Sequence, residues 1–465
     1  MAARATAQRR KVDTMVGPRG RGARSRALLG AVWTVVLVGC LALSGCGGFF
    51  GGGSSAGTGK TTITFWDNNG GPDRTPLWEH VIAEFEKQQP DIHVEYVGIP
   101  ISQVQQKYDT AIAGGGLPDV GGVSTAYLAG MTAQQALEPL DERLSTSGLN
   151  GKLVKGLVDS MRAAGGDDKL YAVPTSSNNG VFWYRKDWFA EAGLEPPQTW
   201  DQFYDVVGKL TDKTRNRYGF TIRGGPGSIP QVLEVMYGYS GIRSIFDEQG
   251  RATVNDPRNV EAVQKLVSLY NTATPTADVN NDYPKMVAQF DGGSVAIMQH
   301  NLGSYRNHKD SLGADNVVGA PVFPSPVTTT RNVLSNPVDG VGVFRTSKNK
   351  DAAWKFVEFA ASAPMNSYWT EKAGVLPANT DVSSESWVRE AQPLRDATAV
   401  LNDPATNVVQ LPYYLPQLNP ILKTDMEPVF QKVMLGQLPA KDFLDQFAQK
   451  LNDAQADWTQ HSGGR

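Results

Sequence analysis

The chain has 465 residues, of which 20% are charged and 40% are apolar, the composition of ordinary globular domains. Its formal net charge is −3, but residues 1–45 carry eight Lys/Arg and a single Asp, so the rest of the chain holds −10. An acidic body excludes a nucleic-acid partner, which requires a basic face. Two Cys and five scattered His form no zinc-binding spacing.

Residues 1–45 have the layout of an export signal. A basic stretch precedes the uncharged segment 27–45, ALLGAVWTVVLVGCLALSG, which ends in small residues. The sequence LSGC ending at Cys46 resembles a bacterial lipobox, in which the Cys is lipidated, and residues 46–60 form a Gly/Ser-rich tether. Two alternatives stay open. Cys40 also ends a lipobox-like sequence, and an apolar stretch of this length nearly spans a bilayer, so it could remain as a membrane helix.

The next part of the chain alternates strands and helices. The β-branched and aromatic run 62–66 predicts a buried strand. Thr75 and Pro76 predict the N-cap and the first helical residue of a helix that Pro90 ends. Strand 92–96, a helix ending at Gly114 and strand 117–123 follow. This β-α-β-α-β order predicts a parallel sheet with helices on its faces. In such sheets ligands lie beyond the carboxyl ends of the strands.

The alternation resumes later in the chain. Thr199 and Gln202 predict a capping box, and Asp256-Pro257 and Asp351 predict two further helix starts. Apolar runs predict strands at 218–222, 294–298 and 341–344. Two α/β lobes of similar size account for this length better than one oversized sheet.

These segments resemble a known family. The chain resembles the extracellular solute-binding proteins of ATP-binding-cassette (ABC) importers, specifically the carbohydrate-binding group that includes maltose-binding protein. The segments that carry the resemblance come in the family's order and follow the lipobox; they are 63–66, 85–96, 111–120, 137–144, 171–203, 290–301, 349–360 and 374–379.

The resemblance implies an α/β, two-lobed periplasmic-binding-protein-like fold of type II. It implies a first lobe of residues 61–175 plus 338–378 and a second lobe of residues 176–337 plus 379–465, with the ligand enclosed between them by hinge closure. It also implies a monomer that is not an enzyme, needs no cofactor, and hands a carbohydrate to the permease subunits of an ABC importer. With the lipobox, it implies an extracytoplasmic lipoprotein anchored to the cell membrane.

The site is expected where polar groups follow the strands or lie at the chain crossings between lobes. Planar amides, carboxylates and aromatic faces bind the hydroxyls and C–H patches of a sugar. With the resemblance, these criteria give the ligand-binding candidates Trp66, Asp67, Asn68, Ser124, Thr125, Asn178, Asn179, His300, Asn301, Asp339, Gly340, Tyr413 and Tyr414.

Structural roles compete with these assignments. Asparagines after a strand also form Asx-turns, Trp66 also fits a lobe core, Ser124 and Thr125 also fit helix capping, and His300 also fits a hydrogen-bonded structural histidine. Gly340 would permit close backbone approach to a ligand. No metal site is expected, because no second ligand is spaced for one.

Two other functions remain as alternatives. A binding protein for glycerol-phosphate-type or other charged solutes would need cations such as Arg74, Arg223 and Arg306 at the site. A lipid-anchored glycoside hydrolase would need a carboxylate pair, for which Asp67 and Asp339 are candidates.

Overall fold

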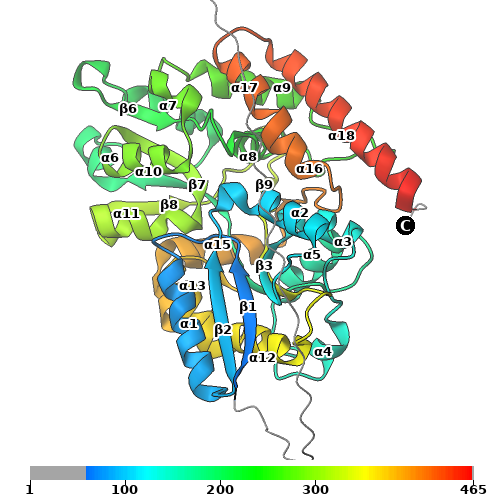
Figure 1. The fold of residues 1–465 in the computed structure, drawn as a ribbon. Coiled ribbons are helices and arrows are strands. Elements are labelled where there is room, and N and C mark those ends of the chain that lie inside the picture. The colour runs from blue at the N-terminus through cyan, green and yellow to red at the C-terminus, as the bar shows by residue number, and fades with distance from the viewer. Residues whose placement is uncertain (1–58, 463–465) are drawn as a thin grey trace, which may run out of the picture. The chain divides into compact units, whose positions relative to one another are not determined.

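The computed structural model describes residues 59–462. The predicted export signal, both candidate lipidation sites and most of the predicted tether lie outside these residues. Within residues 59–462, the structure has no helix that is both long and apolar enough to cross a membrane. The described chain builds two α/β lobes around separate sheets (Figure 1).

The first lobe contains a six-stranded sheet with the strand order β11-β4-β10-β3-β1-β2. Its strands are β1 (Thr61–Asp67), β2 (Ile92–Gly98), β3 (Val120–Ser124), β4 (Val173–Ser177), β10 (Asp339–Val343) and β11 (Leu376–Pro377). β1 runs parallel to β2 and β3, as the alternating pattern predicts. β10 is antiparallel to β3 and β4, and β11 is antiparallel to β4, so the sheet is mixed rather than parallel throughout. The direction changes because β10 starts at the edge where β3 ends.

Helices cover this sheet. They are α1 (Thr75–Gln88), α2 (Val104–Gly114), α3 (Thr125–Ala133), α4 (Asp141–Ser145), α5 (Lys155–Gly165), α12 (Lys350–Ala360) and α13 (Ala363–Ala373). α1 packs on β2, and α12 packs on β1 and β10 (Figure 1). Two predicted N-caps were wrong: Arg74, not Thr75, precedes α1, and Asn349, not Asp351, precedes α12. The Thr75 hydroxyl accepts a hydrogen bond from Gly71 N instead.

The second lobe contains a four-stranded sheet with the order β6-β7-β5-β8, and beside it a two-stranded sheet of β9 and β12. These strands are β5 (Gly180–Arg185), β6 (Tyr218–Thr221), β7 (Val295–Asn301), β8 (Val317–Ala320), β9 (Arg331–Leu334) and β12 (Thr406–Val409). On β5, the side chains of Phe182, Trp183 and Tyr184 are completely buried, so this strand lies in the core of the second lobe.

The remaining helices belong to this second lobe. They are α6 (Lys186–Ala192), α7 (Trp200–Lys209), α8 (Ser228–Ser240), α9 (Pro257–Ser268), α10 (Tyr283–Asp291), α11 (Tyr305–Leu312), α14 (Ser386–Glu390), α15 (Gln392–Asn402), α16 (Leu418–Pro420), α17 (Glu427–Met434) and α18 (Ala440–Ser462). The Thr199 hydroxyl accepts from Gln202 N and the Asp256 carboxylate from Arg258 N, so these two predicted caps are confirmed. The C-terminal helix α18, red in Figure 1, packs against α9 and α17.

Within residues 59–462, the chain passes between the six-stranded and the four-stranded sheet three times. β4 ends in the first sheet at Ser177 and β5 begins in the second at Gly180, so Asn178 and Asn179 form the first crossing. Residues 335–338 link β9 to β10 and form the second. After β11 the chain leaves the first sheet again, and α15 packs on β8 of the second. The crossings therefore lie beside the strand ends at which a ligand is expected.

Candidate functional site

Polar residues converge where strands of the first lobe end. Asp67 is the last residue of β1, Ser124 is the last of β3, and Asp339 is the first of β10. Asp339 pairs with Ser124 in the strand register on one side and with Ser176 on the other. The sheet thus brings together predicted site residues that are far apart in the sequence.

The carboxylate of Asp67 is held by donors of the protein itself. The Asn69 backbone N donates to its Oδ1 at 3.0 Å, and the Tyr96 hydroxyl donates to its Oδ2 at 2.9 Å. Burial raises the pKa of Asp67, because a desolvated carboxylate disfavours its charge. Asp67 fixes the loop that begins at Asn68; its direct contact with a ligand stays a prediction.

Asp339 lies at the centre of the polar cluster. Burial raises the pKa of its carboxyl group to about 6, although the neighbouring side chains of Ser124 and Asn68 favour the charged form. The Asn68 amide also donates to the Tyr127 hydroxyl at 2.6 Å. Asp339 is therefore an acid that can change its charge near neutral pH at the junction of the lobes.

Thr125 and Gly340 both have close contacts within the protein. The Val338 backbone N donates to the Thr125 hydroxyl at 3.1 Å, which ties α3 to the second crossing. A Cβ on Gly340 would lie 2.5 Å from the carbonyl oxygen of Val173. The close backbone approach that Gly340 permits in this structure is thus to β4, and an approach to a ligand stays a prediction.

The second lobe contributes His300 and Asn301 at the end of β7. The His300 ring stacks on Tyr283 with centroids 4.6 Å apart, and its Nδ1 lies 3.2 Å from the Ser304 hydroxyl. Burial lowers the pKa of His300, so the imidazole is neutral at pH 7. The side chain of Asn301 accepts a hydrogen bond from Gly303 N at 3.0 Å.

The two asparagines of the first crossing differ. Asn179 is 8% exposed, and its backbone oxygen accepts from Leu302 N at 3.1 Å, so it anchors the crossing to the second lobe. The side-chain oxygen of Asn178 is buried and has no hydrogen-bond partner among the described residues. The Asn178 side chain thus keeps a buried polar atom that a ligand could use.

The two adjacent tyrosines point to different parts of the protein. The Tyr413 hydroxyl donates to the Ser335 carbonyl at 3.1 Å, beside the second crossing. Burial raises the pKa of Tyr413, and the nearby charge of Asp339 raises it further. The Tyr414 hydroxyl hydrogen-bonds Gln455 on α18, and its ring packs against Trp458 with centroids 5.5 Å apart. Tyr413 is therefore the one placed at the junction of the lobes.

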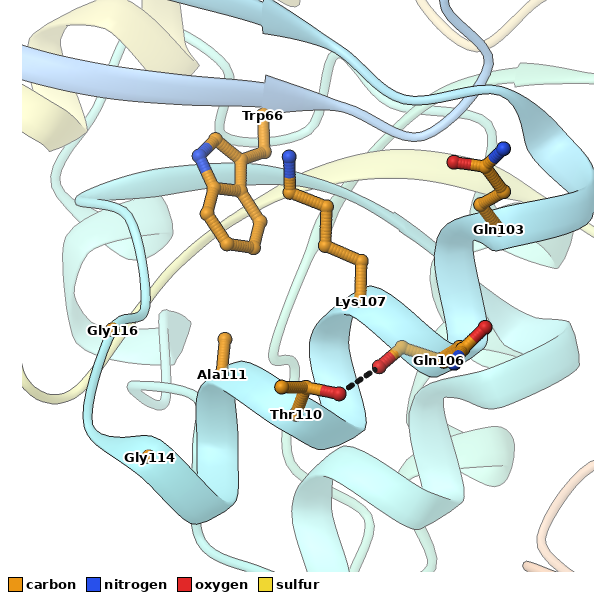
Figure 2. A pocket seen from close by; sticks show the side chains of 8 residues that line it. All are labelled: Trp66, Gln103, Gln106, Lys107, Thr110, Ala111, Gly114 and Gly116. Atoms are coloured by element: carbon orange, nitrogen blue, oxygen red, sulfur yellow. Dashed lines mark hydrogen bonds between the residues drawn. The ribbon is translucent and has the colours of Figure 1, made fainter. Parts of the chain in front are cut away.

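Trp66 lies apart from this cluster. Neighbouring side chains of a strand point to opposite faces, so Trp66 faces away from Asp67 and toward α2. The Lys107 Nζ lies 4.5 Å from the centre of its ring, and both side chains line a surface groove of about 490 Å³ (Figure 2). The Tyr108 ring packs on it as well.

Comparisons with known proteins decide the family. Residues 69–367 match the bacterial extracellular solute-binding protein family. The chain belongs to this family. Its members are non-enzymatic solute-binding proteins, in agreement with the prediction that the chain is not an enzyme.

Individual relatives of this solute-binding protein agree with the family assignment. A putative ABC transporter periplasmic-binding protein of Escherichia coli is 27% identical over 358 residues, which are 76% of this chain and 79% of that protein. The mannitol-binding protein of Pseudomonas aeruginosa is 26% identical over 65% of this chain and 70% of its own length. The GacH receptor of Streptomyces glaucescens superposes with a TM-score of 0.75 at 24% identity, covering 86% of this chain and 99% of that one. The two-lobed α/β fold of periplasmic binding proteins is thereby confirmed.

Two residues at the junction between the lobes were not among the ligand-binding candidates selected from the sequence. Tyr283 stacks on His300 at the start of α10, and Glu234 of α8 is buried against Gly180. Neither follows a strand nor lies at a crossing, so no criterion applied to the sequence selects them. Arg306 is one of the cations that the sequence offers for a charged solute. Its guanidinium donates a hydrogen bond to the Lys372 carbonyl, and its Nε lies 3.5 Å from the Asp310 carboxylate.

Metal chemistry finds no support in the described part of the solute-binding protein. No group of three His, Cys, Asp or Glu side chains within residues 59–462 could hold a metal ion. The junction between the lobes instead carries amides, hydroxyls and carboxylates, which are the groups that hydrogen-bond neutral oxygen-rich ligands.

Proposed function

We propose that the protein captures a sugar or sugar alcohol between its two lobes and delivers it to the permease of an ABC importer. The observation that carries the proposal is membership of the solute-binding family together with a polar cluster at the lobe junction. Similar proteins support the substrate class: one is a mannitol-binding protein, and the GacH receptor was solved in complex with acarbose.

The lobes comprise residues 61–175 plus 338–378 and residues 176–337 plus 379–465. The strand assignments support this division. β4 of the first sheet ends at Ser177, so the first crossing begins two residues after the proposed boundary at residue 175. A ligand that touches Asp339 from one lobe and His300 or Asn301 from the other binds the closed arrangement more tightly than the open one. Differential affinity of this kind drives hinge closure.

The same proposal places the protein outside the cytoplasm as a monomer on a lipid anchor. Its support is the sequence LSGC at Cys46, the basic and apolar segments before it and the Gly/Ser-rich tether after it. The anchor keeps the binding protein close to its permease, which raises the effective concentration of the pair.

A thermal-shift screen of the purified protein tests the function. The ligand panel contains monosaccharides, oligosaccharides, sugar alcohols, glycerol phosphodiesters and polyamines. A ligand that binds only the folded state raises the melting temperature by mass action. A shift with a sugar or sugar alcohol is expected, and a shift with phosphodiesters or polyamines alone would contradict the proposal.

A further inference from the structure

The guanidinium of Arg74 is poorly satisfied by the protein. Its Nη1 is buried and has no hydrogen-bond partner among the described residues. No carboxylate of residues 59–462 comes within 4.0 Å of it, and its Cζ lies over the ring of Trp369, 5.0 Å from the ring centre. Burial lowers the pKa of Arg74, the expected effect when a cation is desolvated without an ion-pair partner. A buried donor without an acceptor is costly, so natural proteins keep few of them.

Arg74 extends from the first lobe to the second. It precedes α1 in the first lobe, yet its Nη2 would lie 4.0 Å from a Cβ on Gly303, which follows β7 in the second. The unpartnered Oδ1 of Asn178 would lie 3.8 Å from the same Cβ. The guanidinium of Arg74, which carries the unpartnered Nη1, and the unpartnered Oδ1 of Asn178 therefore border the same position beside Gly303, which the Oδ1 of Asn301 also approaches at 3.0 Å. A side chain at residue 303 would fill this position.

The charges around this space restrict what it can hold. Asp339 is the acid with the largest electrostatic effect on Arg74, and Asp67 contributes as well. Arg74 and Asp339 nevertheless form no ion pair, so a gap of more than 4.0 Å separates opposite charges. A hydroxyl group in this space could accept from Arg74 and donate to Asn178 or Asp339. A carboxylate has no proton to donate, and it would bring a further negative charge beside two buried acids.

We propose that Arg74 and Asn178 hold one hydroxyl of the solute between the lobes, and that with Asp339 they select neutral polyhydroxy solutes over the corresponding sugar acids. This inference rests on the proposed function and names the substrate class of the same site. Arg74 donates to the oxygen of the hydroxyl. The acceptors Asn178 Oδ1 and the Asp339 carboxylate require a proton from the solute, so they exclude a carboxylate.

The test compares neutral and acidic members of matched pairs by calorimetry: D-glucitol with D-gluconate, D-glucose with D-glucuronate, and D-galactose with D-galacturonate. The full-length protein is expected to bind a neutral member at least tenfold more tightly than its acid. Arg74→Gln should weaken binding of that neutral member at least tenfold. Asp339→Asn should reduce the ratio of the affinity for the neutral member to the affinity for its acid. Equal or tighter binding of the acid would overturn the inference while leaving a sugar-binding function standing.

A second measurement needs no ligand. Because the side chain of Arg74 makes no hydrogen bond or ion pair within residues 59–462, Arg74→Gln should keep or raise the melting temperature of the ligand-free protein. Arg185→Gln is the matched control, since Arg185 donates to the Phe290 carbonyl at 2.9 Å and forms an ion pair with Asp187 at 2.7 Å, and this variant should lose several degrees. A loss in Arg74→Gln as large as in Arg185→Gln would make Arg74 a structural residue and overturn the inference. Failure of all six sugars and acids to bind, with no thermal shift from any sugar or sugar alcohol of the panel, would count against the proposed function instead.

Discussion

The carboxyl group of Glu234 lies against the backbone of Gly180, the first residue of β5 after the interlobe crossing. A Cβ on residue 180 would overlap the Glu234 carboxyl group, and Glu234 is 6% exposed. Gln299 donates a hydrogen bond to its Oε2 at 2.9 Å, but its Oε1 has no partner among the described residues. Burial raises the pKa of Glu234 to about 7. A titrating acid thus supports the start of the strand that carries the chain into the second lobe.

The first prediction concerns the pH dependence of stability. Since the pKa of Glu234 is raised on folding, from 4.5 to about 7, the folded protein holds its proton more tightly than the unfolded chain. This contribution to stability is complete below pH 4.5 and is lost as the pH rises through about 7. Urea unfolding measures the free energy of unfolding of both proteins at pH 5 and pH 8. Between these pH values, the free energy of unfolding of Glu234→Gln should rise by roughly 2–4 kcal/mol relative to that of the wild type. The exposed Glu248→Gln serves as control; an equal pH response of the wild type and Glu234→Gln would contradict the assignment.

The second prediction concerns the pH dependence of ligand binding. Asp339 has a pKa of about 6, and a solute hydroxyl that donates to its carboxylate requires the ionised form. Affinity should be constant above pH 7 and fall as the pH drops below 6, approaching roughly tenfold per pH unit. Calorimetric titrations from pH 8 to pH 4.5 measure this, and Asp339→Asn should show weaker but pH-independent binding. Wild-type affinity that is unchanged at pH 5 would remove Asp339 from the site.

The third prediction concerns Gly340. A methyl group there would press on the Val173 carbonyl and lie 2.9 Å from the Met161 Cε, so Gly340→Ala should lower the free energy of unfolding by about 1–3 kcal/mol. Gly130, within α3, has open space where a Cβ would be, and Gly130→Ala should raise stability by about 0.5–1 kcal/mol. Chemical denaturation of both variants checks the pair. Equal stability of Gly340→Ala and the wild type would show that β10 can shift away from β4.

The sequence predicted the first-lobe elements well because their apolar spacing is regular. Strands β1 to β3 and helices α1 and α2 lie where the pattern places them, and Pro90 and Gly114 mark the helix ends. The antiparallel entry of β10 could not be predicted, because strand direction depends on where the chain returns from the other lobe. The N-cap positions Arg74 and Asn349 were missed because Thr75 and Asp351 are the better capping residues by type.

The candidate site was predictable only in part. Asp67, Ser124 and Asp339 follow or begin strands, so their position at the sheet edge follows from the strand pattern. Which of them keeps a free polar atom depends on partners such as Tyr96, Tyr127 and Val338, and these contacts exist only in the folded chain. Tyr283 and Glu234 come from helices whose registers bring them to the junction, which local sequence does not encode.

The fourth prediction concerns the anchor. Because LSGC at residues 43–46 resembles a lipobox, Cys46→Ser should abolish fatty-acid attachment and leave the folded domain intact. Metabolic labelling with a radiolabelled fatty acid should mark the wild type alone, with circular dichroism as the check on folding. Label that persists in Cys46→Ser and disappears in Cys40→Ser would move the anchor to Cys40.

The central claim is that a sugar or sugar alcohol binds between the lobes and closes them. Small-angle X-ray scattering of the protein, with and without the sugar identified by thermal shift, tests it most directly. The account predicts that saturating ligand reduces the radius of gyration, because contacts to Asp339 in one lobe and Asn301 in the other favour the closed arrangement. A scattering profile that is unchanged by a saturating, tightly bound sugar would contradict it.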